Sequence, residues 1–374
     1  MLARWHPVDL YAHVLAGIVD RNGLDPALIE DVISGCVIQV AEQSGNVGRQ
    51  AVLAAGFPEA VPAVTLDRKC GSAQQAVDFA AQGVLAGAYD VVLAGGVEMM
   101  SRVPMKANRM GKDNMGTAFH RRYPDGLVGQ GISAELIATR WNISRAEQDA
   151  LALRSHRLAA AAEDRGSTAR DILPVPTDDP DVWISRDEGI RRQTTLEKLS
   201  ALQPAFEDSG MAGRFPELRW SVTAGNASQV SDGACAVLIA EERTAERLGL
   251  GARASVEAFA VSGDDPLTML MGIIPATEKL LRRAGLGIDD VDVFEVNEAF
   301  ASVVLAWARH FAVDPERINR LGGAIALGHP VGASGGRLLG NLLRTLDEEG
   351  FRLGLQTMCE SGGMANATLY RRLD

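Results

Sequence analysis

The second half of the chain repeats the first, and this duplication limits the possible folds more than any other feature of the sequence. A helix that ends at Gly23-Leu24 has a counterpart that ends at Gly285-Leu286. A strand-to-helix turn at Cys70 recurs at His329, roughly 260 residues later. Equivalent turns of a duplicated unit lie around a pseudo-two-fold axis, so their tips can converge. We therefore expect Cys70 and His329 to approach one another.

Strands alternate with helices in both halves. In the first half the pattern predicts helices over 7–22, 45–55 and 73–86, and strands over 32–40, 63–66 and 91–95. In the second half it predicts strands over 252–261, 291–296, 353–359 and 365–370, and helices over 275–284 and 298–311. Such alternation is typical of an α/β fold with parallel sheets covered by helices on both faces.

A less regular region separates the halves. Helices are expected over 133–141 and 144–166, where Ser144 and Glu147 form a capping box, but 171–218 is polar and irregular. A stretch of this length is usually a lid or a binding segment. A strand over 234–240 returns to the first sheet. The predicted domains are 1–103 completed by 221–241, a loop domain over 104–220, and 242–374.

The first half has no counterpart of the strand predicted over 252–261. Residues 1–6 stand in its place and are too short and too poorly patterned for a strand. The first strand of a doubly wound sheet is usually central. We therefore expect either a chain start further upstream or a sheet that lacks an inner strand.

Composition excludes several classes of function. The 374 residues carry a formal net charge of −11, which argues against a nucleic-acid partner, although local arginines or helix N-termini can still bind a phosphorylated ligand. Four widely spaced cysteines without a CxxC motif resemble neither a zinc site nor a disulfide framework. There is no apolar run of about 18 residues and no signal-peptide pattern. These features predict a reduced, cytoplasmic protein without a membrane partner.

Four segments carry the residues suited to chemistry. They are the turn at Cys70, Asn297-Glu298-Ala299-Phe300, Gly328-His329-Pro330, and Met358 to Met364 with Cys359. All four are predicted at the C-terminal ends of strands, where open α/β sheets bind ligands. At a helix N-terminus the unpaired N–H groups favour a thiolate, so Cys70 is a candidate nucleophile.

Each of these residues also has a plain structural interpretation. Cys70 and Cys359 could be small core residues, His329 a hydrogen-bonded structural histidine, and Asn297 a helix cap. Glu298 could support the site or occupy the first turn of a helix, where the dipole favours a carboxylate. Cys36 and Cys235 are expected to be inert core residues. His156, between Arg154 and Arg157, is expected on a solvated helix face.

Taken together, the four segments closely resemble the thiolase family of acetyl-CoA acyltransferases. The resemblance extends over essentially the whole chain and includes Ala224-Gly225-Asn226-Ala227-Ser228 and Gly332-Ala333-Ser334-Gly335. It implies a five-layered α/β/α/β/α fold of two similar doubly wound halves, plus a loop domain over a CoA channel. It also implies a homodimer or homotetramer, CoA thioesters as substrates, and neither a metal nor another cofactor.

The resemblance also implies a role for each site residue. Cys70 would accept the acyl group as a thioester, and His329 would take its proton. Cys359 would exchange a proton at the α-carbon of acetyl-CoA, and Asn297 would orient a water at the enolate oxygen. Backbone N–H groups of Cys70 and Ser361 would form an oxyanion hole. Ser228 would contact the pantetheine arm of CoA.

Two departures from the family pattern bear on substrate and on mechanism. Ser361 stands where a glycine is usual, which is unfavourable if the backbone there has a positive φ. Residues 128–131 replace a usual His-Met-Gly beside the acyl pocket, so the acyl preference stays open. Two alternatives remain. One is a ketosynthase-type condensing enzyme, which the second cysteine, Cys359, argues against, and the other is a non-catalytic CoA-binding relative with a shortened N-terminus.

Overall fold

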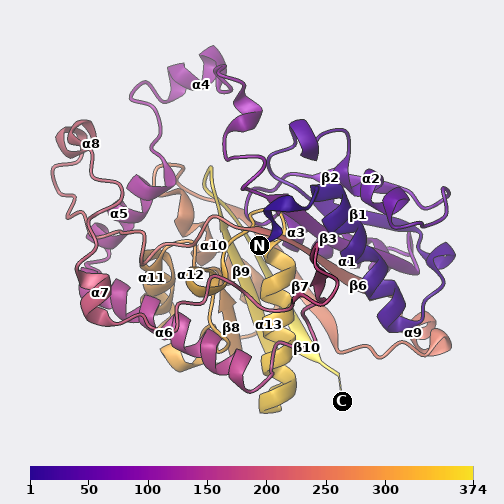
Figure 1. The fold of residues 1–374 in the computed structure, drawn as a ribbon. Coiled ribbons are helices and arrows are strands. Elements are labelled where there is room, and N and C mark those ends of the chain that lie inside the picture. The colour runs from indigo at the N-terminus through magenta and orange to yellow at the C-terminus, as the bar shows by residue number, and fades with distance from the viewer. Residues whose placement is uncertain (374) are drawn as a thin grey trace.

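Two four-stranded sheets organise residues 1–373, which the computed structural model describes (Figure 1). The first sheet has the order β2-β1-β3-β6 and the second has the order β7-β10-β9-β8. The strands of the first sheet are β1 (Asp31–Gly35), β2 (Ala63–Leu66), β3 (Val91–Met99) and β6 (Asp232–Ala240). Those of the second are β7 (Ala254–Gly263), β8 (Val293–Val296), β9 (Leu353–Glu360) and β10 (Met364–Arg372).

The duplication is visible in the order and the direction of the strands. The run β1-β3-β6 in one sheet matches β8-β9-β10 in the other: the first pair is parallel and the second pair is antiparallel. The prediction of wholly parallel sheets is therefore wrong. The cause is clearest in β9 and β10, because a three-residue turn can join only antiparallel neighbours.

The strand that the sequence analysis found missing from the first sheet corresponds to an edge strand, not to an inner strand. Its counterpart β7 lies at the edge of the second sheet, where it pairs antiparallel with β10. The equivalent place in the first sheet is the edge beside β6, which is half-buried along its whole length. The expectation of a missing central strand is corrected accordingly.

Helices cover and separate the two sheets, which gives the five layers expected. The outer face of the first sheet packs against α1 (Pro7–Asn22) and α2 (Val47–Ala54). Between the sheets lie α3 (Ser72–Leu85) and α13 (Ser334–Glu349), whose apolar faces share one core with both. The outer face of the second sheet packs against α10 (Ile273–Ala284) and α11 (Ala301–Phe311).

One predicted strand is shorter than expected, and one strand of the first sheet has no full counterpart in the second. The predicted strand 32–40 ends at Gly35, because the N–H groups of Val37 and Ile38 bind the buried carboxylate of Glu98 instead of a neighbouring strand. In the second half the counterpart of β2 is reduced to a single bridge between Phe294 and Ile318. The short helices α12 (Ala324–Leu327) and α9 (Glu242–Leu248) complete the two halves.

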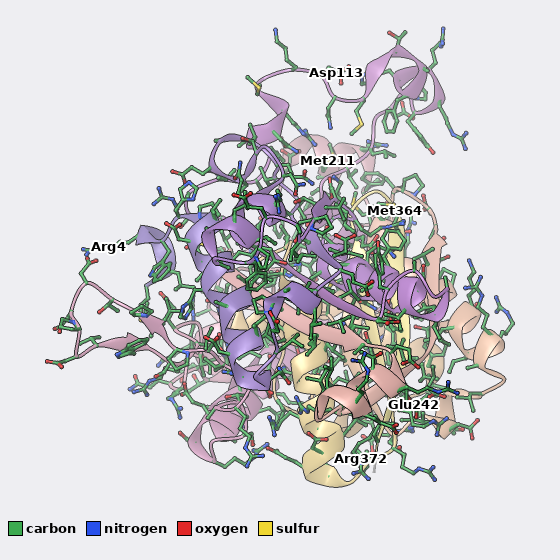
Figure 2. The ribbon with its side chains drawn as sticks, turned by 90° about the vertical axis from the view of Figure 1, so that its right-hand side faces the viewer. Arg4, Asp113, Met211, Glu242, Met364 and Arg372 are labelled. Atoms are coloured by element: carbon green, nitrogen blue, oxygen red, sulfur yellow. The ribbon has the colours of Figure 1, made fainter. Side chains whose placement is uncertain are left out.

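The region between the halves contains short elements joined by irregular chain. These are α4 (Gly116–Arg122), α5 (Gln130–Arg140), α6 (Arg145–Asp164), β4 (Val175–Pro176), β5 (Trp183–Ile184), α7 (Leu196–Ser200) and α8 (Ser209–Arg214). The predicted capping box at Ser144 and Glu147 is present. The segment that carries α4 projects from the body, with Asp113 near its tip (Figures 1 and 2).

Single turns of 3-10 helix occur at Leu2–Arg4, Pro26–Leu28, Ala41–Gln43, Ala107–Arg109, Met269–Gly272, Ile288–Asp290 and Pro315–Arg317. Within residues 1–373, the search for a helix with the length and hydropathy of a membrane span found no candidate.

Candidate active site

Cys70 lies in a tight turn between β2 and α3, as the sequence predicts. Asp67 accepts a hydrogen bond from the backbone N–H of Lys69 (2.7 Å), and Lys69 has a positive φ of 50°. The hydroxyl of Ser72 accepts from the N–H of Arg68 (2.9 Å) and donates to the carbonyl of Lys69 (2.6 Å). These local hydrogen bonds hold the cysteine at the N-terminus of α3.

Burial has more effect on the Cys70 thiol than the helix N-terminus does. Desolvation, followed by the nearby Glu360 carboxyl, raises the pKa of Cys70 to about 12, although its own backbone N–H favours the thiolate. The expectation of a stabilised thiolate is therefore wrong for the unliganded site. Cys70 is a thiol at neutral pH, and a base is needed to make it a nucleophile.

His329 has the geometry of such a base. Burial, and then the positive charge of Arg337, lowers the pKa of His329 to about 3, so the imidazole is neutral. Its Nδ1 lies 2.6 Å from Oγ of Ser334, which donates its own proton to the carbonyl of Pro330 (2.9 Å). Nδ1 must therefore carry the ring proton and donate to Ser334. The lone pair of Nε2 is left to accept a proton.

The other predicted catalytic residues gather around the same point. Asn297 follows β8 directly, and its Nδ2 lies 3.5 Å from Nε2 of His329. The Asn297 amide also hydrogen-bonds the thiol of Cys359, and the charge of Cys70 contributes to raising the pKa of that thiol, after burial. Hydrogen bonds thus connect Cys359, Asn297 and His329, and Cys70 of the first half is near enough for its charge to act on Cys359. The sequence predicted that His329 follows a strand, and this is wrong, because His329 lies between α12 and α13.

Ser361 begins the turn between β9 and β10 without the strain that its replacement of glycine suggested. The left-handed conformations fall on the next two residues, Gly362 (φ 89°) and Gly363 (φ 80°), whereas Ser361 is not among the residues with positive φ. Glycine is therefore required at 362 and 363. The turn lies directly after Glu360, two residues from Cys359.

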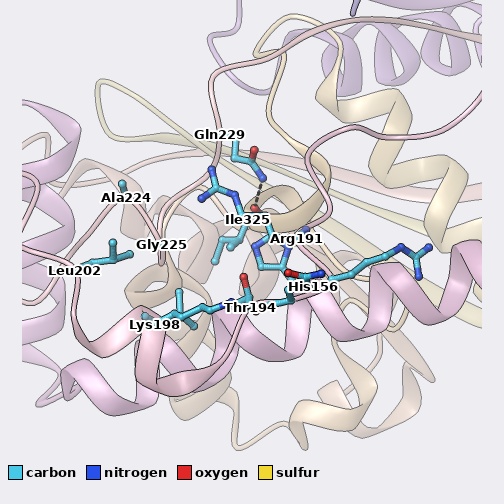
Figure 3. A pocket seen from close by; sticks show the side chains of 12 residues that line it. His156, Arg191, Thr194, Lys198, Leu202, Ala224, Gly225, Gln229 and Ile325 are labelled. Atoms are coloured by element: carbon cyan, nitrogen blue, oxygen red, sulfur yellow. Dashed lines mark hydrogen bonds between the residues drawn. The ribbon is translucent and has the colours of Figure 1, made fainter.

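A basic cavity of about 450 Å³ is lined by residues of the loop region together with Gln229 and Ile325 (Figure 3). Arg191, Lys198 and His156 contribute to its lining, as do Ala224 and Gly225 of the Ala-Gly-Asn-Ala-Ser segment. Ser228 is half-buried just beyond, where its backbone N–H donates to the carbonyl of Ala299 (2.9 Å). An acidic chain that concentrates positive charge at a cavity has a site suited to an anionic ligand.

Gln229 connects this cavity to His329. Its side chain lines the cavity and donates to the carbonyl of Ile325 (2.8 Å), while its backbone carbonyl accepts from the N–H of His329 (3.1 Å). Sequence reasoning missed Gln229, Arg191 and Lys198. The adjacent Arg191 and Arg192 were the available signal, but Arg192 is paired with Glu163 and Asp164.

Two buried carboxylates hold the loops that present the site. Glu98, at the end of β3, accepts from the N–H groups of Val37 (2.8 Å) and Ile38 (3.2 Å) and from the N–H of Gly332, in the turn after His329. It was not singled out from the sequence. Glu298 accepts from Ser155 (2.6 Å), from Asn319 (3.0 Å) and from the N–H of Ile325 (3.2 Å), so it supports the site.

His156 differs from its prediction. It is buried, and its Nδ1 accepts from the backbone N–H of Arg191 (3.1 Å). Burial, and then the charge of Arg191, lowers the pKa of His156 to about 4, so the ring is neutral and can accept. Rather than facing solvent, His156 holds the segment that carries Arg191 at the cavity.

Among residues 1–373, the search for three or more His, Cys, Asp or Glu side chains placed to hold a metal ion found no group. The site consists of thiol, imidazole, amide and backbone groups. These groups suit proton transfer and covalent catalysis.

Comparisons with known proteins match this geometry. The family models for "Thiolase, N-terminal domain" and "Thiolase, C-terminal domain" match residues 1–243 and 250–372. The chain belongs to the thiolase family. Thiolases are acyltransferases that exchange acyl groups between acyl-CoA and acetyl-CoA through an acyl-cysteine. CoA thioesters are their substrates, and they use no further cofactor.

Named relatives and a solved structure are similar to this thiolase over nearly its whole length. Steroid 3-ketoacyl-CoA thiolase FadA6 of Mycobacterium tuberculosis is 46% identical over 100% of this chain and 90% of its own. A 3-ketoacyl-CoA thiolase of Pseudoalteromonas translucida is 42% identical over 98% of this chain and 92% of its own. The crystal structure of Bacillus anthracis acetyl-CoA acetyltransferase has a TM-score of 0.88 at 35% identity, covering 100% of this chain and 94% of that one.

Proposed function

We propose that Cys70 is the nucleophile of this thiolase and His329 its base. Nε2 of His329 takes the thiol proton, and the Cys70 sulfur bonds to the thioester carbon of the acyl-CoA. The tetrahedral intermediate collapses, the bond from carbon to the CoA sulfur breaks, and CoA leaves with that proton. The observation that carries this assignment is the neutral imidazole of His329. Ser334 fixes its tautomer with Nε2 as the acceptor, and Asn297 joins the ring to Cys359.

Cys359 is the acid and base of the second proton transfer in this proposal. As a thiolate, Cys359 removes a proton from the α-carbon of acetyl-CoA, and the resulting carbanion attacks the acyl-Cys70 carbonyl. The bond from that carbon to the Cys70 sulfur breaks to give 3-oxoacyl-CoA, and the proton on Cys359 passes to the released Cys70 sulfur. Asn297, which contacts both Cys359 and His329, orients a water at the enolate oxygen. The backbone N–H groups of Cys70 and Ser361 form the oxyanion hole for the tetrahedral intermediates.

The basic cavity is the CoA entrance in this proposal. The cavity lining carries the side chains of Arg191 and Lys198, which suit the phosphates of CoA, and Gln229 connects the cavity to His329. Ser228 lies between the cavity and Ala299 and contacts the pantetheine arm. The loop domain, 104–220, covers this channel, while 1–103 with 221–241 and the segment 242–374 form the two catalytic halves.

The acyl group that we propose is bulky and ring-bearing. Support comes from the 46% identical relative, which is named a steroid 3-ketoacyl-CoA thiolase. Residues 128–131 include two glycines near the family's acyl pocket. A Cβ built on Gly129 would meet no atom within 4 Å, which leaves room there, whereas the ring of Phe206 fills the space at Gly131. A panel of 3-oxoacyl-CoA substrates tests this, with a higher kcat/KM for ring-bearing than for short-chain members expected. A preference for acetoacetyl-CoA would contradict it.

We also propose a cytoplasmic homo-oligomer. All four cysteines are free thiols, as in a reducing compartment. The strand β2 forms an open edge of the first sheet, where a second copy can pair.

Two cysteine variants test the catalytic assignment. Cys70→Ala is expected to abolish both acyl transfer and rapid labelling by iodoacetamide at this site. Cys359→Ala is expected to keep acyl loading on Cys70 but to lose exchange of the acetyl-CoA α-protons. Thiolysis of acetoacetyl-CoA, followed by loss of its enolate absorbance, gives the overall rate. Full activity of Cys70→Ala would refute the nucleophile, and unchanged exchange in Cys359→Ala would favour a one-cysteine condensing enzyme.

A further inference from the structure

A buried carboxyl group with no role in the mechanism above lies against the nucleophile turn. Glu360 is the last residue of β9 and is fully buried. A Cβ atom built on Gly71 would lie 2.0 Å from its Oε1. Since Gly71 is the neighbour of Cys70 and the N-cap of α3, the Glu360 carboxyl fills the space behind the nucleophile. Only glycine leaves room for it at position 71.

A second oxygen that needs a hydrogen-bond donor lies against the same side of Gly71 as the Glu360 carboxyl. The same Cβ on Gly71 would lie 2.9 Å from Oδ1 of Asn366. Within residues 1–373, neither oxygen of Glu360 nor Oδ1 of Asn366 has a hydrogen-bond partner. Flipping the Asn366 amide would not help, because Nδ2 already donates to Gln75 (3.2 Å) and Asp78 (3.1 Å).

Protonation of the Glu360 carboxyl supplies the donor that these two oxygens lack. A carboxylate and an amide oxygen are both acceptors, and two buried acceptors without a donor are unfavourable. A neutral carboxylic acid has an O–H group that can donate to Asn366 Oδ1. Burial raises the pKa of Glu360 to about 9, which agrees with the neutral form at physiological pH.

We propose that Glu360 is a positioning residue for Cys70: as a neutral acid it donates to Asn366 and supports the nucleophile turn, and its ionisation suppresses thiolate formation at alkaline pH. This inference rests on the proposed role of Cys70. No group is transferred in it; one proton leaves Glu360 to solvent as the pH rises.

The charged groups around Glu360 determine the direction of the effect. Arg68, in the nucleophile turn, lowers the pKa of Glu360, whereas Asp78 on α3 and Asp67 raise it. Across the site, the charge of Glu360 raises the pKa of Cys70 and of Cys359. Glu360 is neutral below a pH of about 9 and ionised above it, so the penalty on the Cys70 thiolate begins above that pH.

Alkylation of Cys70 by iodoacetamide, measured from pH 6 to pH 10.5 by mass spectrometry of the Cys70 peptide, tests the proposal in the full chain. In the wild type the rate is expected to rise with pH and then to flatten above about pH 9. In Glu360→Gln, whose amide stays neutral and can donate to Asn366, the flattening is expected to vanish. The rate at pH 10 rises about tenfold over wild type, one pKa unit, and stays within about twofold at pH 7.

Two further variants separate this coupling from a merely structural role. Asp78→Asn removes a charge that raises the pKa of Glu360, so the flattening is expected to move to lower pH. Glu295→Gln is the matched control, because burial also raises the pKa of Glu295, to about 8, but that residue lies beside Arg337 and Glu298. Its profile is expected to follow the wild type.

The labelling experiment separates a failure of the Glu360 proposal from a failure of the Cys70 assignment. Labelling of a peptide other than the Cys70 peptide would overturn the role of Cys70 itself. Labelling at Cys70 with no flattening in the wild type, or with the same flattening in Glu360→Gln, would overturn the role of Glu360. If Glu360→Gln does not fold, the wild-type profile and the shift in Asp78→Asn decide, and an unshifted profile refutes the proposal.

Discussion

At the scale of single residues, the proposed mechanism depends on which nitrogen of His329 carries the proton. Ser334 decides this, because its only hydroxyl proton is donated to the carbonyl of Pro330 and its lone pair must accept from Nδ1. Ser334 lies in a glycine-rich segment that the sequence analysis used only as a family motif. The hydrogen bond makes it a positioning residue.

Removing that hydroxyl is expected to slow acylation. In Ser334→Ala, Nδ1 loses its acceptor, and the imidazole can adopt the tautomer in which Nε2 is protonated and no longer a base. The acylation rate constant, from a rapid-quench burst, is expected to fall at least about tenfold, part of the 10²–10⁴ that a positioned base supplies. KM for the acyl-CoA should change little, because Ser334 is buried behind the ring.

Ser302→Ala is the matched control for this prediction. Ser302 is equally buried and donates to a backbone carbonyl, that of Ala134 (3.0 Å), rather than bonding the imidazole. A burst in Ser334→Ala as fast as in Ser302→Ala would show that the tautomer is held by other means.

The sequence alone proposes which residues form the candidate site, but it does not indicate their protonation states. Motifs and the repeat were enough to bring Cys70, His329, Asn297 and Cys359 to one point. The helix N-terminus suggested a thiolate at Cys70, whereas burial raises its pKa to about 12. Burial depends on what the other half of the chain places over the residue, which no local pattern records.

At the scale of elements, local signals predicted helices well and strand neighbours poorly. The capping box of α6 and the glycine ends of α1 and α10 lie where the sequence places them. The edge position of β7 and the early end of β1 were missed, because both depend on partners far along the chain. Glu98 is the clearest example, since its carboxylate replaces a strand partner for residues 37 and 38.

Glu98→Ala is therefore expected to destabilise the junction between the halves. It removes one acceptor from at least three buried donors, the N–H groups of Val37 and Ile38 and the side-chain amide of Gln43 (2.7 Å). Buried donors without partners lower the free energy of unfolding, here by about 2 kcal/mol or more. Urea denaturation followed by fluorescence measures the change.

The control is Glu42→Ala, which removes an exposed carboxylate paired with Arg102. Surface ion pairs contribute little to stability, so its unfolding midpoint should stay close to wild type. Equal midpoints for Glu98→Ala and Glu42→Ala would mean that water replaces the buried carboxylate.

At the scale of the whole molecule, the five layers bury both sheets but leave strand edges open. In the first sheet, β2 is an edge strand whose backbone groups on one side have no neighbouring strand within residues 1–373. Val64 in this strand is 45% exposed, which is unusual for a valine in a strand of an α/β protein. An exposed apolar edge favours pairing with another chain, and a second copy offers the same edge.

Val64→Lys is accordingly expected to convert a dimer into a monomer. The ammonium group would be desolvated beside its symmetry mate, and like charges opposite one another weaken a strand pair. Sedimentation velocity at micromolar concentration should show twice the chain mass for wild type and the chain mass, 39.8 kDa, for the variant.

Val182→Lys is the control. Val182 is 50% exposed but lies just before β5 in the loop domain, so this variant should stay dimeric. Because each site here is built from residues of one chain, the monomer should still acylate Cys70. A wild type that is monomeric at all concentrations, or a Val64→Lys variant that remains a dimer, would show that β2 is not the interface.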